Sequence, residues 1–226
     1  IRALRRIAAR WADLVFVPSF GMAERWGLVR DPAIRSRLVE MPNGVDAERF
    51  RPDAEPDPRA KGAVLYVGRL SPEKNLLRLA EACRLIGARL VCVGQGPLAS
   101  RLRAAGAEIH GPVFNEHLPG WYTAAACFAL PSLTEGSPKA LLEAAASDIP
   151  CVVSDEVSRW APNYVIGVNP MHTGDIASGL RLALKMRALG CQNTVLRERV
   201  RRNHDLRALL RREVELVWGV ARGHAR

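Results

Sequence analysis

The sequence of 226 residues predicts an α/β fold built on a doubly wound parallel sheet of the Rossmann-like kind. Two observations support this prediction. From residue 63 onward, short apolar runs alternate with longer segments of helical periodicity. The runs are apolar at nearly every position, as in strands that helices cover on both faces. Ligands of such sheets bind at the carboxyl ends of the strands, so we expect function in the loops that follow the apolar runs.

Two strands and a helix are expected before this sheet. Residues 1–11 follow a helical pattern, and apolar runs at 14–17 and 38–41 predict one strand each. The expected strands of the main sheet cover residues 63–67, 89–93, 108–110, 127–130, 151–154 and 165–168. The expected helices cover residues 72–86, 98–105, 119–126, 138–146 and 175–189.

The composition changes between residues 50 and 58, a segment with three prolines and three acidic residues. Such a segment is typical of a stiff, exposed linker. The predicted organisation is therefore a remnant of an amino-terminal lobe at 1–50, a linker at 51–61, a Rossmann-like domain at 62–190 and basic helices at 191–226. Since the helical pattern has already begun at residue 1, we interpret the chain as part of a longer protein.

The net charge of +10 is concentrated at the ends of the chain. Residues 1–11 contribute +4 and residues 185–226 contribute +7, whereas the middle has a net charge of −1. Without interleaved aromatic residues or a known motif, this charge does not predict nucleic-acid binding. It indicates either solvated helices or attraction to an anionic membrane surface. No segment has the length and apolarity of a membrane span or signal peptide, so we expect a cytoplasmic protein, peripheral on the inner face of the membrane if the charge binds lipid.

The cysteines and histidines do not predict a metal site. The five cysteines stand far apart and form no CxxC pair, and the five histidines have no metal-ligand spacing. We interpret the cysteines as buried apolar side chains, and we predict neither a metal nor a cofactor.

The loop after the first main strand carries two cations. Arg69 and Lys74 flank Ser71 and Pro72, which are a good N-cap and a good first helical residue. Two cations beside a helix amino terminus form a site suited to a diphosphate. The alternative is that both side chains are simply solvated.

The loop after the fourth main strand carries two carboxylates. Glu135 precedes the helix expected to start at Pro138, and Glu143 lies within it, so the two groups can accept hydroxyls from different parts of one ligand. The backbone amides of Lys139 and Ala140 would face the same ligand as anion donors. Alternatively, Glu135 only interacts with the helix dipole. Glu143 has apolar neighbours in sequence, and a carboxylate in such surroundings needs a partner.

Six motifs in this order resemble the carboxyl-terminal half of the family-4, GT-B fold, retaining glycosyltransferases, known as glycosyl transferases group 1. They are MPNGVD (41–46), VGRLSPEKN (67–75), VGQGP (93–97), GPV (111–113), LPSLTEGSPKALLEAAA (130–146) and IPCVVSD (149–155). The resemblance is strong over residues 41–155. It implies that the α/β sheet is the donor-binding lobe of a GT-B enzyme.

The resemblance also implies the parts of the donor site. Gly68, Arg69 and Lys74 would hold the donor diphosphate, and Val113 would lie against the nucleobase. Glu143 would bind the ribose hydroxyls. Glu135 would meet hydroxyls of the transferred sugar and, with both cations, would be catalytic.

The segment around Pro138 would surround the sugar and the phosphate with Ser137, Lys139 and Ala140. The sequence departs from the family here, because many relatives have glycine at the position of Pro138. Proline, unlike glycine, has no amide hydrogen to donate. It departs again at Asp148, where glycine is usual, and in the irregular stretch 156–163.

The expected reaction is transfer of a sugar from a nucleoside-diphosphate sugar to a saccharide or lipid-linked acceptor, with retention. The sequence has no D-x-D triplet to hold a metal, so the two cations would stabilise the departing diphosphate. The alternative is a non-catalytic donor-binding module that requires a partner chain. The two strands before the linker are too few for an acceptor lobe, and their apolar surface favours a homodimer.

Overall fold

The computed structural model describes residues 2–158 and 164–223, without the side chains of residues 2–6. The chain divides into two compact units. The larger unit comprises Val45–Glu135 and Lys139–Asn203. The smaller unit comprises the residues up to Gly44, Gly136–Pro138 and the residues from His204 onward.

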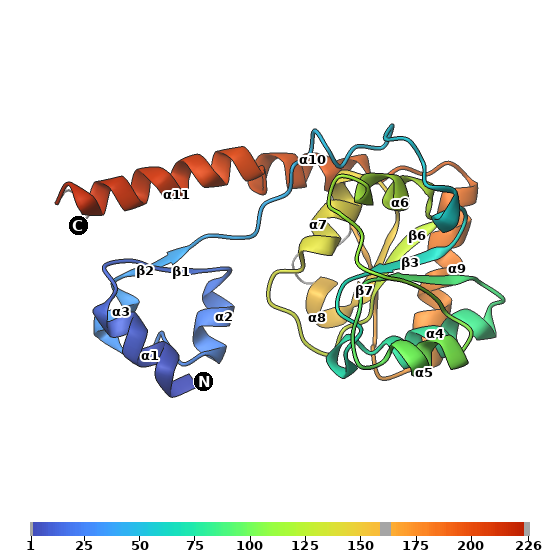
Figure 1. The fold of residues 1–226 in the computed structure, drawn as a ribbon, viewed down its shortest axis with the longest axis horizontal. Helices are drawn as coiled ribbons and strands as arrows, with labels where there is room; N and C mark the ends of the chain where they lie inside the picture. Colours follow the sequence, from blue (N-terminus) through green and yellow to red (C-terminus); the bar gives the residue numbers. More distant parts are fainter. Residues whose placement is uncertain (1, 159–163, 224–226) are drawn as a thin grey trace. The chain divides into compact units, whose positions relative to one another are not determined.

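The larger unit is built on a six-stranded parallel sheet with the strand order β5-β4-β3-β6-β7-β8 (Figure 1). The order reverses between β3 and β6, which is the switch point where such sheets bind ligands at the carboxyl ends of their strands. The strands are β3 (Val64–Val67), β4 (Leu90–Val93), β5 (Glu108–His110), β6 (Cys127–Leu130), β7 (Cys151–Ser154) and β8 (Ile166–Val168).

Helices cover both faces of this sheet. Figure 1 shows α4 and α5 on one side and α6 and α7 on the other. The long helix α9 packs on α4, and α10 packs on α7. The helices are α4 (Leu76–Leu85), α5 (Ala99–Ala104), α6 (Leu118–Ala124), α7 (Lys139–Ala146), α8 (Asp155–Ser158), α9 (Thr173–Ala188) and α10 (Thr194–Asn203), with short 3-10 turns η1 (Pro58–Ala60) and η2 (Pro72–Lys74).

The central strands β4, β6 and β7 are buried at every position, which explains why they read as continuous apolar runs in the sequence. The expected doubly wound α/β fold is confirmed. The predicted bounds of the strands at 108–110, 127–130 and 151–154 agree with the observed ones, and the other three strands of the six-stranded sheet begin one residue later than predicted.

The smaller unit contains a parallel pair of short strands, β1 (Val15–Val17) and β2 (Leu38–Glu40). Its small core includes Val17, Ala23 and Ile34. The long helix α11 begins at the N-cap Asp205, whose side chain accepts a hydrogen bond from the amide of Ala208, and it buries no residue. The helices of this unit are α1 (Arg2–Trp11), α2 (Phe20–Arg25), α3 (Pro32–Arg35) and α11 (Leu206–Ala221).

The division between the units differs from the predicted boundary. It falls after Gly44 rather than in the linker 51–61, because Val45, Ala47 and Phe50 are buried in the core of the larger unit. The amide of Asp57 also donates a 2.9 Å hydrogen bond to the carbonyl of Gly120 in α6. The predicted basic segment 191–226 is likewise divided, since α10 belongs to the larger unit and α11 to the smaller.

Three other details of the sequence interpretation are corrected or lie outside the structure. The helix predicted at 72–86 is interrupted at Asn75, whose backbone is left-handed with φ 59°. Four cysteines are buried as expected, but Cys191 is exposed. Residues 159–163 of the irregular stretch lie outside the described residues. Among the described residues, no helix has the length and apolarity needed to span a bilayer.

Candidate functional site

The loop after β3 approaches the loop after β4 so closely that side chains are excluded between them. Gly68 has φ 146° and Gly94 has φ 141°, backbone conformations that favour glycine. A Cβ atom on Gly94 would overlap the carbonyl oxygen of Gly68, and the amide of Leu70 donates a 2.9 Å hydrogen bond to the carbonyl of Gln95. The packing fixes the backbone from which the exposed Arg69 side chain extends.

Asn75 joins this loop to two others. Its side-chain amide donates to the carbonyl of Pro131 after β6, at 3.1 Å, and to that of Pro170 after β8, at 2.7 Å. Its Oδ1 atom accepts a 3.0 Å hydrogen bond from Arg78. Asn75 adopts the left-handed region more readily than most residues, which explains why the predicted helix breaks there. The loops after β3, β6 and β8 are thereby connected through one side chain.

Lys74 and Glu135 meet at the carboxyl ends of β3 and β6. The Nζ atom of Lys74 lies 2.7 Å from Oε1 of Glu135, and their side chains are only 20% and 11% exposed. The hydroxyl of Ser132 donates to the same oxygen at 2.8 Å. Two residues predicted for the site from separate motifs therefore form one ion pair.

Ser71 does not cap the helix with its side chain as predicted. Its backbone is at the N-cap position of η2, but its side chain makes no capping hydrogen bond. The hydroxyl instead donates to Oε1 of Glu73 at 2.6 Å, and this hydrogen bond lowers the pKa of Glu73. The amide of Leu133 donates to the carbonyl of Glu73 at 2.9 Å, which adds a second link between the loops after β3 and β6.

Glu143 has the partner that its apolar surroundings require. The hydroxyl of Tyr122 in α6 donates to Oε2 of Glu143 in α7 at 2.7 Å. Burial raises the pKa of Glu143, while the hydrogen bond from Tyr122 and the charge of Lys139 lower it in part. Tyr122 is fully buried, and its hydroxyl orients a predicted ligand-binding carboxylate.

The remaining predicted residues take separate places. Val113 is half-buried and packs against the core, whereas Lys139 is exposed and starts α7, followed by the half-buried Ala140. Ser137 and Pro138 group with the smaller unit, where the carbonyl of Ser137 accepts a 2.6 Å hydrogen bond from Asn43. Their predicted roles near the donor stay predictions.

The departure at Asp148 fits the backbone. Asp148 has φ 59°, the left-handed conformation in which glycine is usual. Burial raises the pKa of Asp148, and hydrogen bonds from the amide of Asn193 and the side chain of Thr194 lower it in part. Asp148 therefore links the end of α7 to the start of α10.

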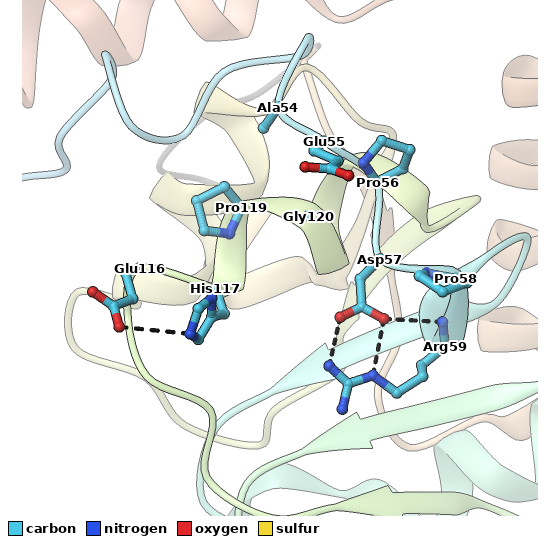
Figure 2. A pocket seen from close by; sticks show the side chains of 10 residues that line it. All are labelled: Ala54, Glu55, Pro56, Asp57, Pro58, Arg59, Glu116, His117, Pro119 and Gly120. Carbon is cyan, nitrogen blue, oxygen red and sulfur yellow. Dashed lines mark hydrogen bonds and ion pairs between the residues drawn. The ribbon is translucent and has the colours of Figure 1, made fainter.

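A cavity of about 500 Å³ lies elsewhere in the larger unit, between the predicted linker and α6. Figure 2 shows the carboxylate of Asp57 bound to the guanidinium of Arg59, with Glu116 and His117 opposite. None of the predicted donor-site residues lines it. Arg59 also stacks over the ring of the buried Trp121 at 4.5 Å, so this ion pair serves the packing of α6.

Among the described residues, no three His, Cys, Asp or Glu side chains gather closely enough to hold a metal ion. The candidate site predicted from the sequence combines the cations Arg69 and Lys74 with the carboxylates Glu135 and Glu143, and contacts made by Asn75, Ser132 and Tyr122 position its loops and carboxylates. Sequence reasoning missed these last three. The one indication in the sequence was Glu143, a carboxylate among apolar neighbours, which requires a buried hydrogen-bond donor as its partner.

Comparison with known proteins gives a family match over the same region. Residues 61–180 match the model of the family described as glycosyl transferases group 1. The chain is 34% identical over 142 residues to the UDP-Gal:alpha-D-GlcNAc-diphosphoundecaprenol alpha-1,3-galactosyltransferase of Escherichia coli, covering 53% of this chain and 37% of that protein.

Two further similarities cover more of the chain. The chain is 32% identical over 192 residues to the GDP-mannose-dependent alpha-(1-6)-phosphatidylinositol monomannoside mannosyltransferase of Mycobacterium tuberculosis, covering 72% of this chain and 48% of that protein. Its fold resembles the sucrose-phosphate synthase of Thermosynechococcus elongatus with a TM-score of 0.82 at 20% identity, covering 98% of this chain and 62% of that one. The chain thus spans less than half the length of these two sequence relatives.

Proposed function

Because the chain belongs to the glycosyl transferases group 1 family, we propose that it is the donor-binding part of an enzyme that transfers a sugar from a nucleoside-diphosphate sugar. The observation that carries this proposal is the 2.7 Å pair of Lys74 and Glu135. It joins the loops after β3 and β6 at the switch point of the sheet, inside the region that matches the family. A cation for the diphosphate and a carboxylate for the sugar hydroxyls are thus adjacent.

The proposed chemistry depends on charge stabilisation. When the bond between the anomeric carbon and the diphosphate oxygen breaks, negative charge grows on the departing diphosphate. Arg69 and Lys74, with the amides of Lys139 and Ala140 at the start of α7, would be donors to that charge and lower the barrier. Glu135 would hold the sugar through its hydroxyls, Glu143 would hold the ribose, and Val113 would contact the base.

The proposal includes two features of the reaction, one supported by the family resemblance and one by the residues of the chain. The reaction would retain the anomeric configuration, and it would need neither a metal ion nor a cofactor. The cations Arg69 and Lys74 support the second feature, since they supply the charge that a divalent ion otherwise supplies to a diphosphate. The nucleobase of the donor would contact Val113, for which uracil and guanine are the candidates, because the relatives are named for UDP-Gal and GDP-mannose.

We further assign a saccharide or lipid-linked acceptor to the complete enzyme. The named acceptors of the two relatives are a diphosphoundecaprenol-linked sugar and a phosphatidylinositol mannoside, which supports a lipid-linked acceptor. The Arg-rich helices α10 and α11 would favour an anionic membrane surface on the cytoplasmic side. Co-sedimentation with phosphatidylglycerol vesicles, and none with phosphatidylcholine vesicles, is the expected result.

A second candidate function is a non-catalytic donor-binding module that works with a partner chain or as a homodimer. The observation in its favour is that the described residues of the smaller unit contain only two strands, of three residues each. A parallel pair of this size is normally part of a larger sheet. Product formation by this chain in the presence of an added acceptor lobe would distinguish the enzyme from the module.

Calorimetric titration with UDP and with GDP, both in the presence of EDTA, tests the proposed donor site. The unmodified chain is expected to bind one of them, with no gain of affinity when EDTA is replaced by Mg²⁺. The double variant Arg69→Ala, Lys74→Ala is expected to bind at least about tenfold more weakly, because charged hydrogen bonds are worth about 1.5 to 3 kcal/mol each.

The matched control is Arg84→Ala, which removes an exposed cation from α4 and should bind like the unmodified chain. Equal affinities of the double variant, the control and the unmodified chain would sink the assignment of the diphosphate site.

A further inference from the structure

We propose that Tyr122 is a positioning residue of the donor site: its hydroxyl orients the carboxylate of Glu143 toward the ribose. The inference rests on the proposed function, which gives Glu143 that role. It adds a residue from outside the loops that follow β3 and β6. Tyr122 lies in α6, on the element that precedes β6, and contacts Glu143 across the junction with α7.

The ring of Tyr122 is fixed by its packing. The side chain is fully buried, the ring meets Phe50 edge-on with centroids 5.8 Å apart, and it lies 6.0 Å from the ring of Phe128. Because aromatic neighbours on two sides hold the ring, the position of the hydroxyl is set by the core. The hydroxyl is therefore a rigid reference point for whatever it binds.

Among the described residues, the acceptor of that hydroxyl is Glu143. The O–H···O distance of 2.7 Å to Oε2 is in the range of hydrogen bonds to an ionised carboxylate. In the part of the chain that the structure describes, Oε1 of Glu143 accepts no hydrogen bond. A carboxylate held through one oxygen presents the other in a defined direction, as a ribose diol requires.

The protonation states of Tyr122 and Glu143 also support the proposed role of Tyr122 as a positioning donor. Burial raises the pKa of Tyr122 well above its ordinary value, so the hydroxyl keeps its proton and stays a donor. Burial also raises the pKa of Glu143, and the hydrogen bond from Tyr122 is the largest influence that lowers it again. The hydroxyl thus favours the ionised carboxylate, which can only accept hydrogen bonds.

The helix α7, which carries Glu143, packs against β7 and α10, and each of these three elements carries a further titratable or charged group. Lys139 of α7 lowers the pKa of Glu143 through its charge. Cys151 of β7 is buried with a raised pKa, so it stays neutral. Arg197 of α10 donates to the carbonyl of Ala146 at 3.1 Å and is engaged there. Tyr122 is therefore the neutral donor on which the carboxylate depends.

The substitution Tyr122→Phe tests this inference, because it keeps the ring in its packing and removes only the hydroxyl. Titrations of the whole chain with UDP and with GDP are made from pH 5 to pH 8, beside thermal unfolding. We expect about tenfold weaker nucleotide binding near neutral pH. Since binding requires ionised Glu143, it is lost as the pH falls through the pKa of that group, and this loss is expected at a higher pH in the variant.

Two further variants separate the explanations. Tyr164→Phe removes a tyrosine hydroxyl elsewhere in the larger unit and should leave both affinity and pH profile unchanged. Glu143→Gln should abolish the acid-side loss of binding, and it tests the pair even if Tyr122→Phe does not fold. A chain with Tyr122→Phe that is folded and binds like the unmodified chain at every pH overturns the inference, as does a Glu143→Gln profile equal to that of the unmodified chain. Failure of the unmodified chain to bind either nucleotide overturns the proposed function itself.

Discussion

The Nζ atom of Lys74 and the Oε1 atom of Glu135 are 2.7 Å apart although the residues are separated by 61 positions in the chain. Each belongs to a different strand-end loop, so the ion pair exists only when β3 and β6 are neighbours in the sheet. The pair means that the cation proposed for the diphosphate and the carboxylate proposed for the sugar influence each other. A change to one should alter the availability of the other.

Glu135→Ala is the first expected consequence. Without the carboxylate, Lys74 has no competitor for the diphosphate, so binding of free UDP or GDP should stay equal or become tighter. Binding of UDP-glucose or GDP-mannose relative to the free nucleotide should weaken about tenfold, because a charged hydrogen bond to the sugar is lost. Calorimetry with each pair of ligands measures this ratio, and Glu116→Ala, which removes a carboxylate that is 72% exposed, is the control that should bind all four ligands like the unmodified chain. An equal loss for nucleotide and nucleotide-sugar would contradict the assigned role.

Glu143→Gln should separate stability from binding. Burial raises the pKa of Glu143 in the folded state, so the folded chain binds a proton more tightly than the unfolded one. This group therefore destabilises the fold increasingly as the pH rises above the unfolded pKa, and the effect is complete above the folded pKa. The neutral glutamine can still accept from Tyr122, and we expect the free energy of unfolding at pH 7 to rise by up to about 1 kcal/mol. Nucleotide affinity should fall in the same variant.

Urea unfolding at pH 7 and at pH 5 measures that gain, which should shrink at the lower pH as Glu143 takes up its proton. Glu116→Gln neutralises a carboxyl group that is 72% exposed and should change little at either pH. A lower stability of Glu143→Gln at pH 7 would mean that the charge, rather than the desolvation, dominates at this position.

Gly94→Ala should destabilise the larger unit and weaken nucleotide binding together. The new Cβ atom would overlap the carbonyl oxygen of Gly68, and φ 141° is unfavourable for alanine, so we expect a loss of about 2 to 4 kcal/mol. Gly174→Ala is the matched control in α9, where a Cβ atom meets nothing within 4 Å. It should be neutral or gain up to about 1 kcal/mol. Thermal unfolding that ranks the two variants in the opposite order would refute the close approach of the two loops.

The sequence predicted the strands of the larger unit well, because strands buried on both faces leave a continuous apolar signal that needs no knowledge of neighbours. Lys74, Glu135 and Glu143 were predicted as site residues from their motifs. The contacts that position them were not predicted. Asn75 lies within an otherwise helical pattern, and its two carbonyl partners follow β6 and β8, 56 and 95 residues away in sequence. Tyr122 is an aromatic residue of the kind that packs in a core, and only the fold shows which polar atom accepts a hydrogen bond from its hydroxyl.

The isolated chain is expected to bind donor without transferring sugar. Transfer requires an acceptor hydroxyl within about 3 to 3.5 Å of the reacting carbon, and much of the rate comes from this positioning. The strands β1 and β2 have three residues each, fewer than a covered parallel sheet of an acceptor lobe needs, so we expect no acceptor site on them. A panel of nucleotide-sugars with saccharide and lipid acceptors, analysed by mass spectrometry against the hydrolysis background, measures transfer. Rapid product formation by the verified 226-residue monomer would show that the chain is a complete enzyme.

The bridge made by Asn75 has a thermodynamic consequence for the donor. Ordering a loop residue costs about 1 to 2 kcal/mol of conformational entropy, and a ligand that had to order the loops after β3, β6 and β8 would lose much of its affinity to that cost. Here the amide of one side chain fixes Pro131 and Pro170 as the protein folds. The entropy is therefore lost on folding rather than on binding, which would lower the entropic cost of binding the proposed diphosphate ligand.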